Sequence, residues 1–106
     1  MSNNNPIELF QKESPDVAEA YKNFIQSLRQ TKGLDGKTKQ LIYIGIKAAL
    51  GDETAVKYHV PMAKAMGATR EEIKDTILLT LSTSGLRGVT SCLPSALETY
   101  DQEKEC

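Results

Sequence analysis

Residues 37–61 read KTKQLIYIGIKAALGDETAVKYHVP, and this stretch decides the fold of the chain. Its first half is apolar at nearly every angle around a helix axis and lacks the two-residue alternation of a half-buried strand. Gly51 ends that helix, and Asp52 or Thr54 caps a second helix that carries His59, the only histidine. Imidazole has the ordinary side-chain pKa closest to neutrality, so any catalytic interpretation of this chain involves His59.

Helix signals recur along the rest of the chain, and strand alternation does not. The most specific signal is the capping box of Thr69 and Glu72. Pro61 lies inside the helix that carries His59, where its missing peptide N–H predicts a kink or a break. We expect helices over about 6–12, 15–32, 36–50, 53–66, 70–81 and 89–100, with a break at 82–88. The predicted fold class is all-α, with about six helices in a single domain spanning residues 1–106.

Composition narrows the classes of partner. The chain has 106 residues and a formal net charge of −1, and its lysines and arginines form no basic stripe of the kind that binds phosphates. The N-terminus has no signal-peptide pattern, and no apolar run approaches the ~20 residues that span a bilayer. We therefore expect a soluble, cytoplasmic protein that binds neither nucleic acid nor membranes.

The apolar helix within residues 37–51 predicts self-association. A helix that is apolar on all sides must be covered on all sides, and a domain of this size has few helices to cover it. A closed homo-oligomer solves this problem. The alternative is that the remaining helices of one chain suffice.

The two cysteines, Cys92 and Cys106, form neither a C-x-x-C pair nor a metal-ligand pattern, and no metal site is expected. We interpret Cys92 as a small packing residue of a helix and keep a redox role for it as an alternative. Cys106 is the terminal residue.

Several ordered motifs resemble the carboxymuconolactone decarboxylase family, which includes the alkylhydroperoxidase D-like proteins. They are KTKQLI at 37–42, AALG at 48–51, HV at 59–60, GATREEI at 67–73 and SGL at 84–86. The resemblance covers a core of about residues 16–100. It implies an all-helical fold that assembles into trimers or hexamers.

In the peroxidase branch of that family, a glutamate precedes the pattern C-x-x-C-x-x-x-H. With His59 as the histidine, the two cysteine positions fall on Asp52 and Ala55, and the glutamate position falls on Gln40. A thiol peroxidase needs one thiolate to attack the peroxide and a second thiol to resolve the sulfenic acid. The resemblance therefore favours the decarboxylase branch, whose reaction needs no cofactor.

The decarboxylase branch implies a lyase or related acid–base enzyme that acts on a small anionic substrate, such as an unsaturated lactone or keto acid. His59 would deliver the proton and Gln40 would orient it. Arg87, in the break before the last helix, would bind a substrate carboxylate. Two alternatives stay open: an oligomeric ligand-binding protein without catalysis, and a peroxidase that uses Cys92.

Overall fold

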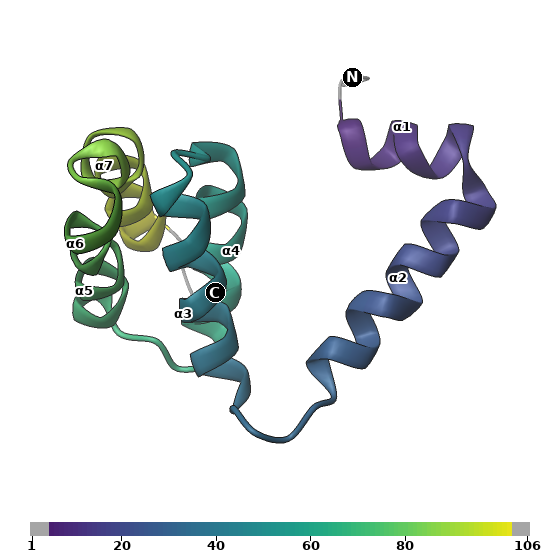
Figure 1. The fold of residues 1–106 in the computed structure, drawn as a ribbon, viewed down its shortest axis with the longest axis horizontal. Coiled ribbons are helices and arrows are strands. Elements are labelled where there is room, and N and C mark those ends of the chain that lie inside the picture. Colours follow the sequence, from purple (N-terminus) through teal and green to yellow (C-terminus); the bar gives the residue numbers. More distant parts are fainter. Residues whose placement is uncertain (1–4, 103–106) are drawn as a thin grey trace. The chain divides into compact units, whose positions relative to one another are not determined.

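The computed structural model describes residues 5–102, and every regular element in that range is a helix, which confirms the all-α class (Figure 1). The structure has a four-residue helix, α6 (Leu81–Ser84), at the start of the segment predicted to be a break. The helices of the described residues are α1 (Pro6–Glu13), α2 (Pro15–Arg29), α3 (Gly36–Ala49), α4 (Glu53–Ala65), α5 (Arg70–Leu79), α6 (Leu81–Ser84) and α7 (Arg87–Gln102).

The chain divides into two compact units, residues 1–33 and 34–106. In the first unit, α1 and α2 contact one another, and the rings of Phe10 and Tyr21 meet edge to face with centroids 6.2 Å apart. Ala18 is the only buried residue among the described residues of this unit. Four large apolar side chains of α2 stay exposed, namely Val17, Tyr21, Phe24 and Leu28.

The second unit contains the hydrophobic core, in which α4 packs against α3 and α7, and α5 packs against the same two helices. Each fully buried isoleucine or valine contributes about 1.5–3 kcal/mol of transfer free energy. This core therefore fixes the faces that α3 and α4 turn toward each other. Its buried members are Ile44, Ala48, Val56, Val60, Ala63, Ala68, Ile73, Ile77, Cys92 and Ala96.

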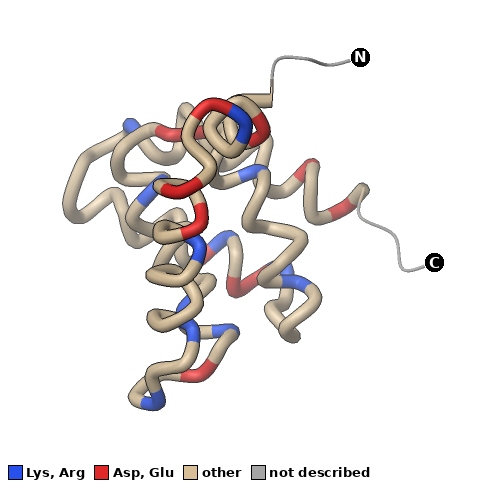
Figure 2. Tube along the Cα trace, turned by 90° about the vertical axis from the view of Figure 1, so that its right-hand side faces the viewer, with Lys and Arg blue, Asp and Glu red and all other residues tan. Residues whose placement is uncertain are grey.

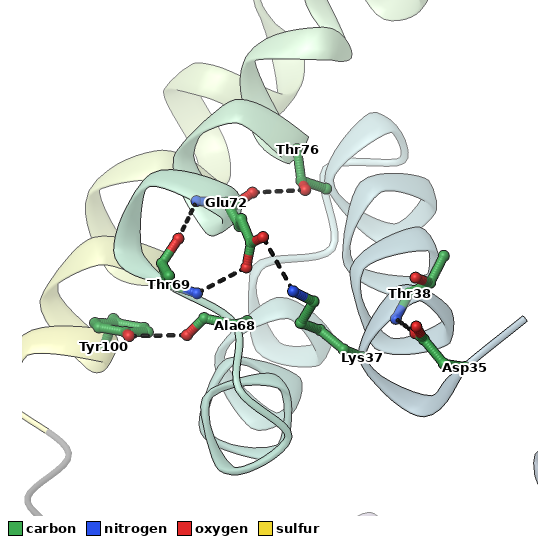
Figure 3. Close-up of polar contacts among 8 residues, drawn as sticks. All are labelled: Asp35, Lys37, Thr38, Ala68, Thr69, Glu72, Thr76 and Tyr100. Carbon is green, nitrogen blue, oxygen red and sulfur yellow. Dashed lines mark hydrogen bonds and ion pairs between the residues drawn. The ribbon is translucent and has the colours of Figure 1, made fainter.

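Side-chain caps define where the helices of the second unit begin. The carboxylates of Asp35 and Asp52 accept hydrogen bonds from backbone N–H groups in the first turns of α3 and α4. Thr69 and Glu72 form the predicted capping box of α5, as Figure 3 shows. The same Glu72 carboxylate binds Lys37 at 3.1 Å, so one side chain caps α5 and ties it to α3.

Two glycines allow close backbone approaches at the end of α3. Gly51 has a φ of +76°, and its N–H donates to the carbonyl of Ala48. A Cβ at Gly88 would lie 2.6 Å from Oγ1 of Thr80 and 2.8 Å from the carbonyl oxygen of Ala48. Gly88 therefore lets the first turn of α7 lie directly against α3.

Two local expectations differ from the structure, and a third is settled only in part. Helix α4 runs from residue 53 to residue 65 through Pro61, so the chain does not break there, and the kink stays a prediction. Helix α2 ends at Arg29 rather than near Lys32. Arg87 is the first residue of α7 and does not lie in the break between helices, because the chain turns at Gly85, where φ is +67°, and is helical again two residues later.

Charged residues of both signs are interspersed along the helices, as Figure 2 shows. Among the described residues no helix combines the length and the hydropathy that crossing a bilayer requires. The expected absence of nucleic-acid binding stays a prediction.

Candidate functional site

His59 and Gln40 meet between α4 and α3. Nδ1 of His59 lies 2.9 Å from Oε1 of Gln40, and both side chains are half-buried. Because an amide oxygen only accepts, the ring nitrogen at this contact carries the proton and donates it. The neutral imidazole is therefore held in the tautomer whose basic nitrogen is Nε2.

Tyr43 supports the same imidazole from one ring face. Its ring centroid lies 3.8 Å from the centroid of the His59 ring, with 30° between the planes. Tyr43 follows Gln40 by three residues, so both side chains lie on one face of α3. A hydrogen bond at Nδ1 and a stacked ring together fix both the direction and the tilt of the imidazole. By contrast, the neighbouring Tyr58 is exposed.

Lys47 continues this face of α3 one turn further. Its Nζ lies 5.7 Å from the centroid of the Tyr43 ring and 3.7 Å from Oδ2 of Asp52. The other carboxylate oxygen of Asp52 accepts the N–H of Ala55 and caps α4. The Gln40, Tyr43 and Lys47 side chains therefore form a polar strip on α3 that includes one cation.

Arg87 lies at the opposite end of α3 from Gln40. Its guanidinium donates to the carbonyl of Leu50 at 3.2 Å, and its stem covers Gly51. Ten residues of helix rise separate Leu50 from Gln40, which is about 15 Å. Within one chain the arrangement therefore makes Arg87 a cap for the last carbonyls of α3. A substrate-binding role for Arg87 stays a prediction.

Cys92 is fully buried in the core of the second unit. Burial raises the pKa of its thiol, and the negative charges of Glu53 and then Asp52 raise this pKa further. A raised pKa lowers the fraction of thiolate, which is the nucleophile of cysteine chemistry. This setting disfavours a redox role. Cys106 lies outside the described residues.

Two hollows on the described surface are lined by residues other than His59. One, of about 370 Å³, lies between α3, α5 and α6, and its lining includes Ile42, Gly45 and Leu79. The other, of about 310 Å³, is lined by residues of α4 and α7, including Tyr58. The imidazole of His59 lies half-buried between α3 and α4. The described residues contain no cluster of three or more metal-ligating side chains.

Comparison with known proteins identifies the family. The model of the carboxymuconolactone decarboxylase family matches residues 15–98, which is most of the chain. The chain belongs to this family.

Proteins with similar sequence or structure include two from an archaeon and one from a bacterium. An uncharacterised protein of Methanocaldococcus jannaschii, MJ1511, is 34% identical over 92 residues, which cover 87% of this chain and 86% of that protein. A second protein of the same organism, MJ0742, is 33% identical over 88 residues, covering 82% and 85%. The crystal structure of apo-lpg0406, a family protein of Legionella pneumophila, superposes with a TM-score of 0.81 at 25% identity, covering 92% of this chain and 86% of that one.

Sequence reasoning paired His59 with Gln40 but missed two neighbours in this family member. These neighbours are Tyr43, which stacks on the imidazole, and Lys47, whose ammonium lies over the Tyr43 ring. The signal that finds both is their spacing, because positions 40, 43 and 47 follow the i, i+3, i+7 pattern of one helix face. The apolar character of α3 obscured this polar strip.

Proposed function

We propose that this protein is a cofactor-free acid–base enzyme that decarboxylates a small carboxylated lactone or keto acid, with His59 as the proton donor. Family membership supports the reaction class. The single observation that carries the proposal is the hydrogen bond of 2.9 Å between Gln40 and the only imidazole of the chain. This bond directs Nε2, the nitrogen that exchanges a proton, away from Gln40.

The reaction needs few protein groups. The bond between the departing carboxylate and the ring carbon breaks, CO₂ leaves, and the electron pair delocalises into the conjugated carbonyl. The imidazolium of His59 then gives its Nε2 proton to the carbanionic carbon, and water returns a proton to the ring. Because the acid acts on charge that develops only as CO₂ departs, a fixed proton donor lowers the barrier without holding the substrate more tightly.

The proposal includes a homo-oligomer, a trimer or a hexamer, in which a second copy covers α3. Its side chains Ile42, Ile46 and Leu50 recur every four residues and are exposed, with 58% of Ile46 accessible. At 100° per residue, this apolar face lies beside the face of Gln40, Tyr43 and Lys47. A copy packed on Ile46 would thus border Tyr43, whose ring stacks on His59.

The test is turnover of a carboxylated muconolactone, followed by CO₂ release and by the loss of the substrate's ultraviolet absorption. General acid catalysis is worth about 10²–10⁴ in rate, so His59→Gln should lower kcat at least about a hundredfold. The matched control is Tyr58→Phe, which alters the exposed neighbour on the same helix and should leave kcat unchanged.

Two outcomes would contradict the proposal. Wild-type protein that binds the lactone without turning it over is a ligand-binding protein and not a decarboxylase. Turnover that survives in His59→Gln, with a melting temperature equal to that of the wild type, returns His59 to a packing role.

A further inference from the structure

The polar strip on α3 places the ammonium of Lys47 near His59, the proposed proton donor. Nζ of Lys47 is 5.7 Å from the centroid of the Tyr43 ring, and that ring is stacked on His59 at 3.8 Å. The ammonium therefore lies within the length of two helical turns of the imidazole. This span matches a small ring that carries a carboxylate on one side and a reacting carbon on the other.

Two other lysines of α3 and α4 are engaged elsewhere. Lys37 binds the carboxylate of Glu72 at 3.1 Å. Lys64 donates to the backbone carbonyl of Tyr100 and lies 4.4 Å from the centroid of its ring. These contacts direct both ammonium groups toward α5 and α7, whereas the ammonium of Lys47 lies over the Tyr43 ring that stacks on His59.

The present partner of Lys47 is easily exchanged. The Lys47 and Asp52 side chains are 31% and 42% exposed and approach no closer than 3.7 Å. Ion pairs this open to solvent contribute little to stability. Asp52 keeps its capping bond to Ala55 through its other oxygen. A substrate carboxylate can thus replace Asp52 at Lys47 without loss of the cap on α4.

We propose that Lys47 binds the carboxylate that the substrate retains, while His59 protonates the carbon that CO₂ leaves. This assignment rests on the proposed function. The departing carboxylate is not the partner of Lys47, because an ion pair with it would stabilise the ground state more than a transition state that is losing that charge. The substrate class is accordingly a lactone or keto acid with two carboxylates.

Binding of an unreactive probe tests Lys47 independently of turnover. The probe is 5-oxotetrahydrofuran-3-carboxylate, a saturated lactone acid, and its methyl ester is the uncharged control. Since His59 is the only histidine, the ¹⁵N resonances of one imidazole report occupancy directly. The wild type should prefer the acid to the ester. Lys47→Gln should weaken acid binding about ten- to a hundredfold and leave ester binding unchanged, as expected for loss of a charged hydrogen bond.

Three further variants separate binding from folding. Lys47→Arg should keep the preference for the acid, and Lys57→Gln, the same charge change at an exposed position of α4, should bind as the wild type does. Asp52→Asn removes the competing charge and retains a capping oxygen, so it should tighten acid binding. A gain of affinity cannot arise from misfolding.

Three results overturn the assignment: equal acid affinity in Lys47→Gln and wild type, loss of the acid preference in Arg87→Ala instead, or no acid preference in the wild type. Failure of the proposed function is a different result, namely binding of the probe with no turnover of the lactone. Where turnover is present, Lys47→Gln should raise KM about tenfold or more and change kcat less than about threefold.

Discussion

The side-chain carbonyl of Gln40 accepts a hydrogen bond of 2.9 Å from Nδ1 of His59 and thereby joins α3 to α4. The bond crosses between two consecutive helices and lies beside the stacked rings of Tyr43 and His59. An amide in this position orients the ring without adding a charge to it. The charge state of His59 is therefore open to change by a single substitution at position 40.

Gln40→Glu should raise the pKa of His59 relative to the wild type, since an adjacent carboxylate favours the imidazolium. With a higher pKa, His59 stays protonated up to a higher pH, and the activity should therefore persist to a higher pH. The ¹⁵N shifts of the single imidazole measure this pKa directly in a pH titration. Gln40→Leu is the matched variant without an acceptor and should lose the tautomer preference. Identical titration curves for Gln40→Glu and wild type would contradict the observed contact.

Cys92 should be inert in the folded protein. In a Cys106→Ser background, an aromatic disulfide reagent at pH 8 should react slowly with the native protein and completely once guanidinium unfolds it, because burial and two nearby carboxylates raise the pKa of this thiol. Thiol-dependent turnover of hydrogen peroxide should also be negligible. Rapid native labelling, or peroxidase activity that disappears in Cys92→Ser, would reinstate the redox alternative.

The protein should elute as an oligomer. Light scattering coupled to gel filtration should give a mass of several times 11.7 kDa at micromolar concentration. Ile46→Lys should lower that mass, because Ile46 is exposed in the single chain and the charge would be buried only in an assembly. Thr90→Lys, at an exposed position of α7, is the control. A monomeric wild type would refute the assembly.

Glu72→Gln should make stability less sensitive to acid. The backbone N–H of Thr69, followed by the Lys37 ammonium, lowers the pKa of Glu72 below its ordinary value of 4.5. A lowered pKa contributes stability that is present above the ordinary value and is lost as the pH falls through the folded-state value. The stability difference between wild type and Glu72→Gln, from urea unfolding, should therefore shrink below about pH 4.5.

Glu71→Gln is the control for that measurement. Glu71 also lies in the first turn of α5 and shares the helix dipole, but it pairs only locally with Lys74. Its stability difference from the wild type should be small and change little over the same pH range. A pH profile for Glu72→Gln that matches the profile of this control would contradict the special role of Glu72.

The parts of this fold that were predicted correctly depend on neighbours in the chain. The caps at Asp52 and Thr69 each involve a side chain and a backbone N–H three residues further on, so the local pattern suffices. The end of α2 was placed about three residues too late, because Gln30 and Thr31 are compatible with a helix and only the turn beyond Arg29 excludes it.

Contacts between helices were predictable only in part. The pairing of Gln40 with His59 was expected from the position of each in the family pattern, and the structure contains the contact. Stacking of Tyr43 on that ring depends on the angle and the register at which α3 and α4 pack, which side-chain volumes across the interface decide. The cap that Arg87 provides for Leu50 depends likewise on how α7 crosses α3.

Gly88 sets a limit on how this scaffold can be redesigned. A methyl group there would collide with the backbone oxygen of Ala48 and with the hydroxyl of Thr80, neither of which is the end of a flexible side chain. Gly88→Ala should therefore shift α7 along or away from α3 and move Cys92, four residues further on, out of register with the core. Gly88 therefore fixes the position of α7 along α3. A library of variants of α7 must keep glycine at this position while the other residues vary.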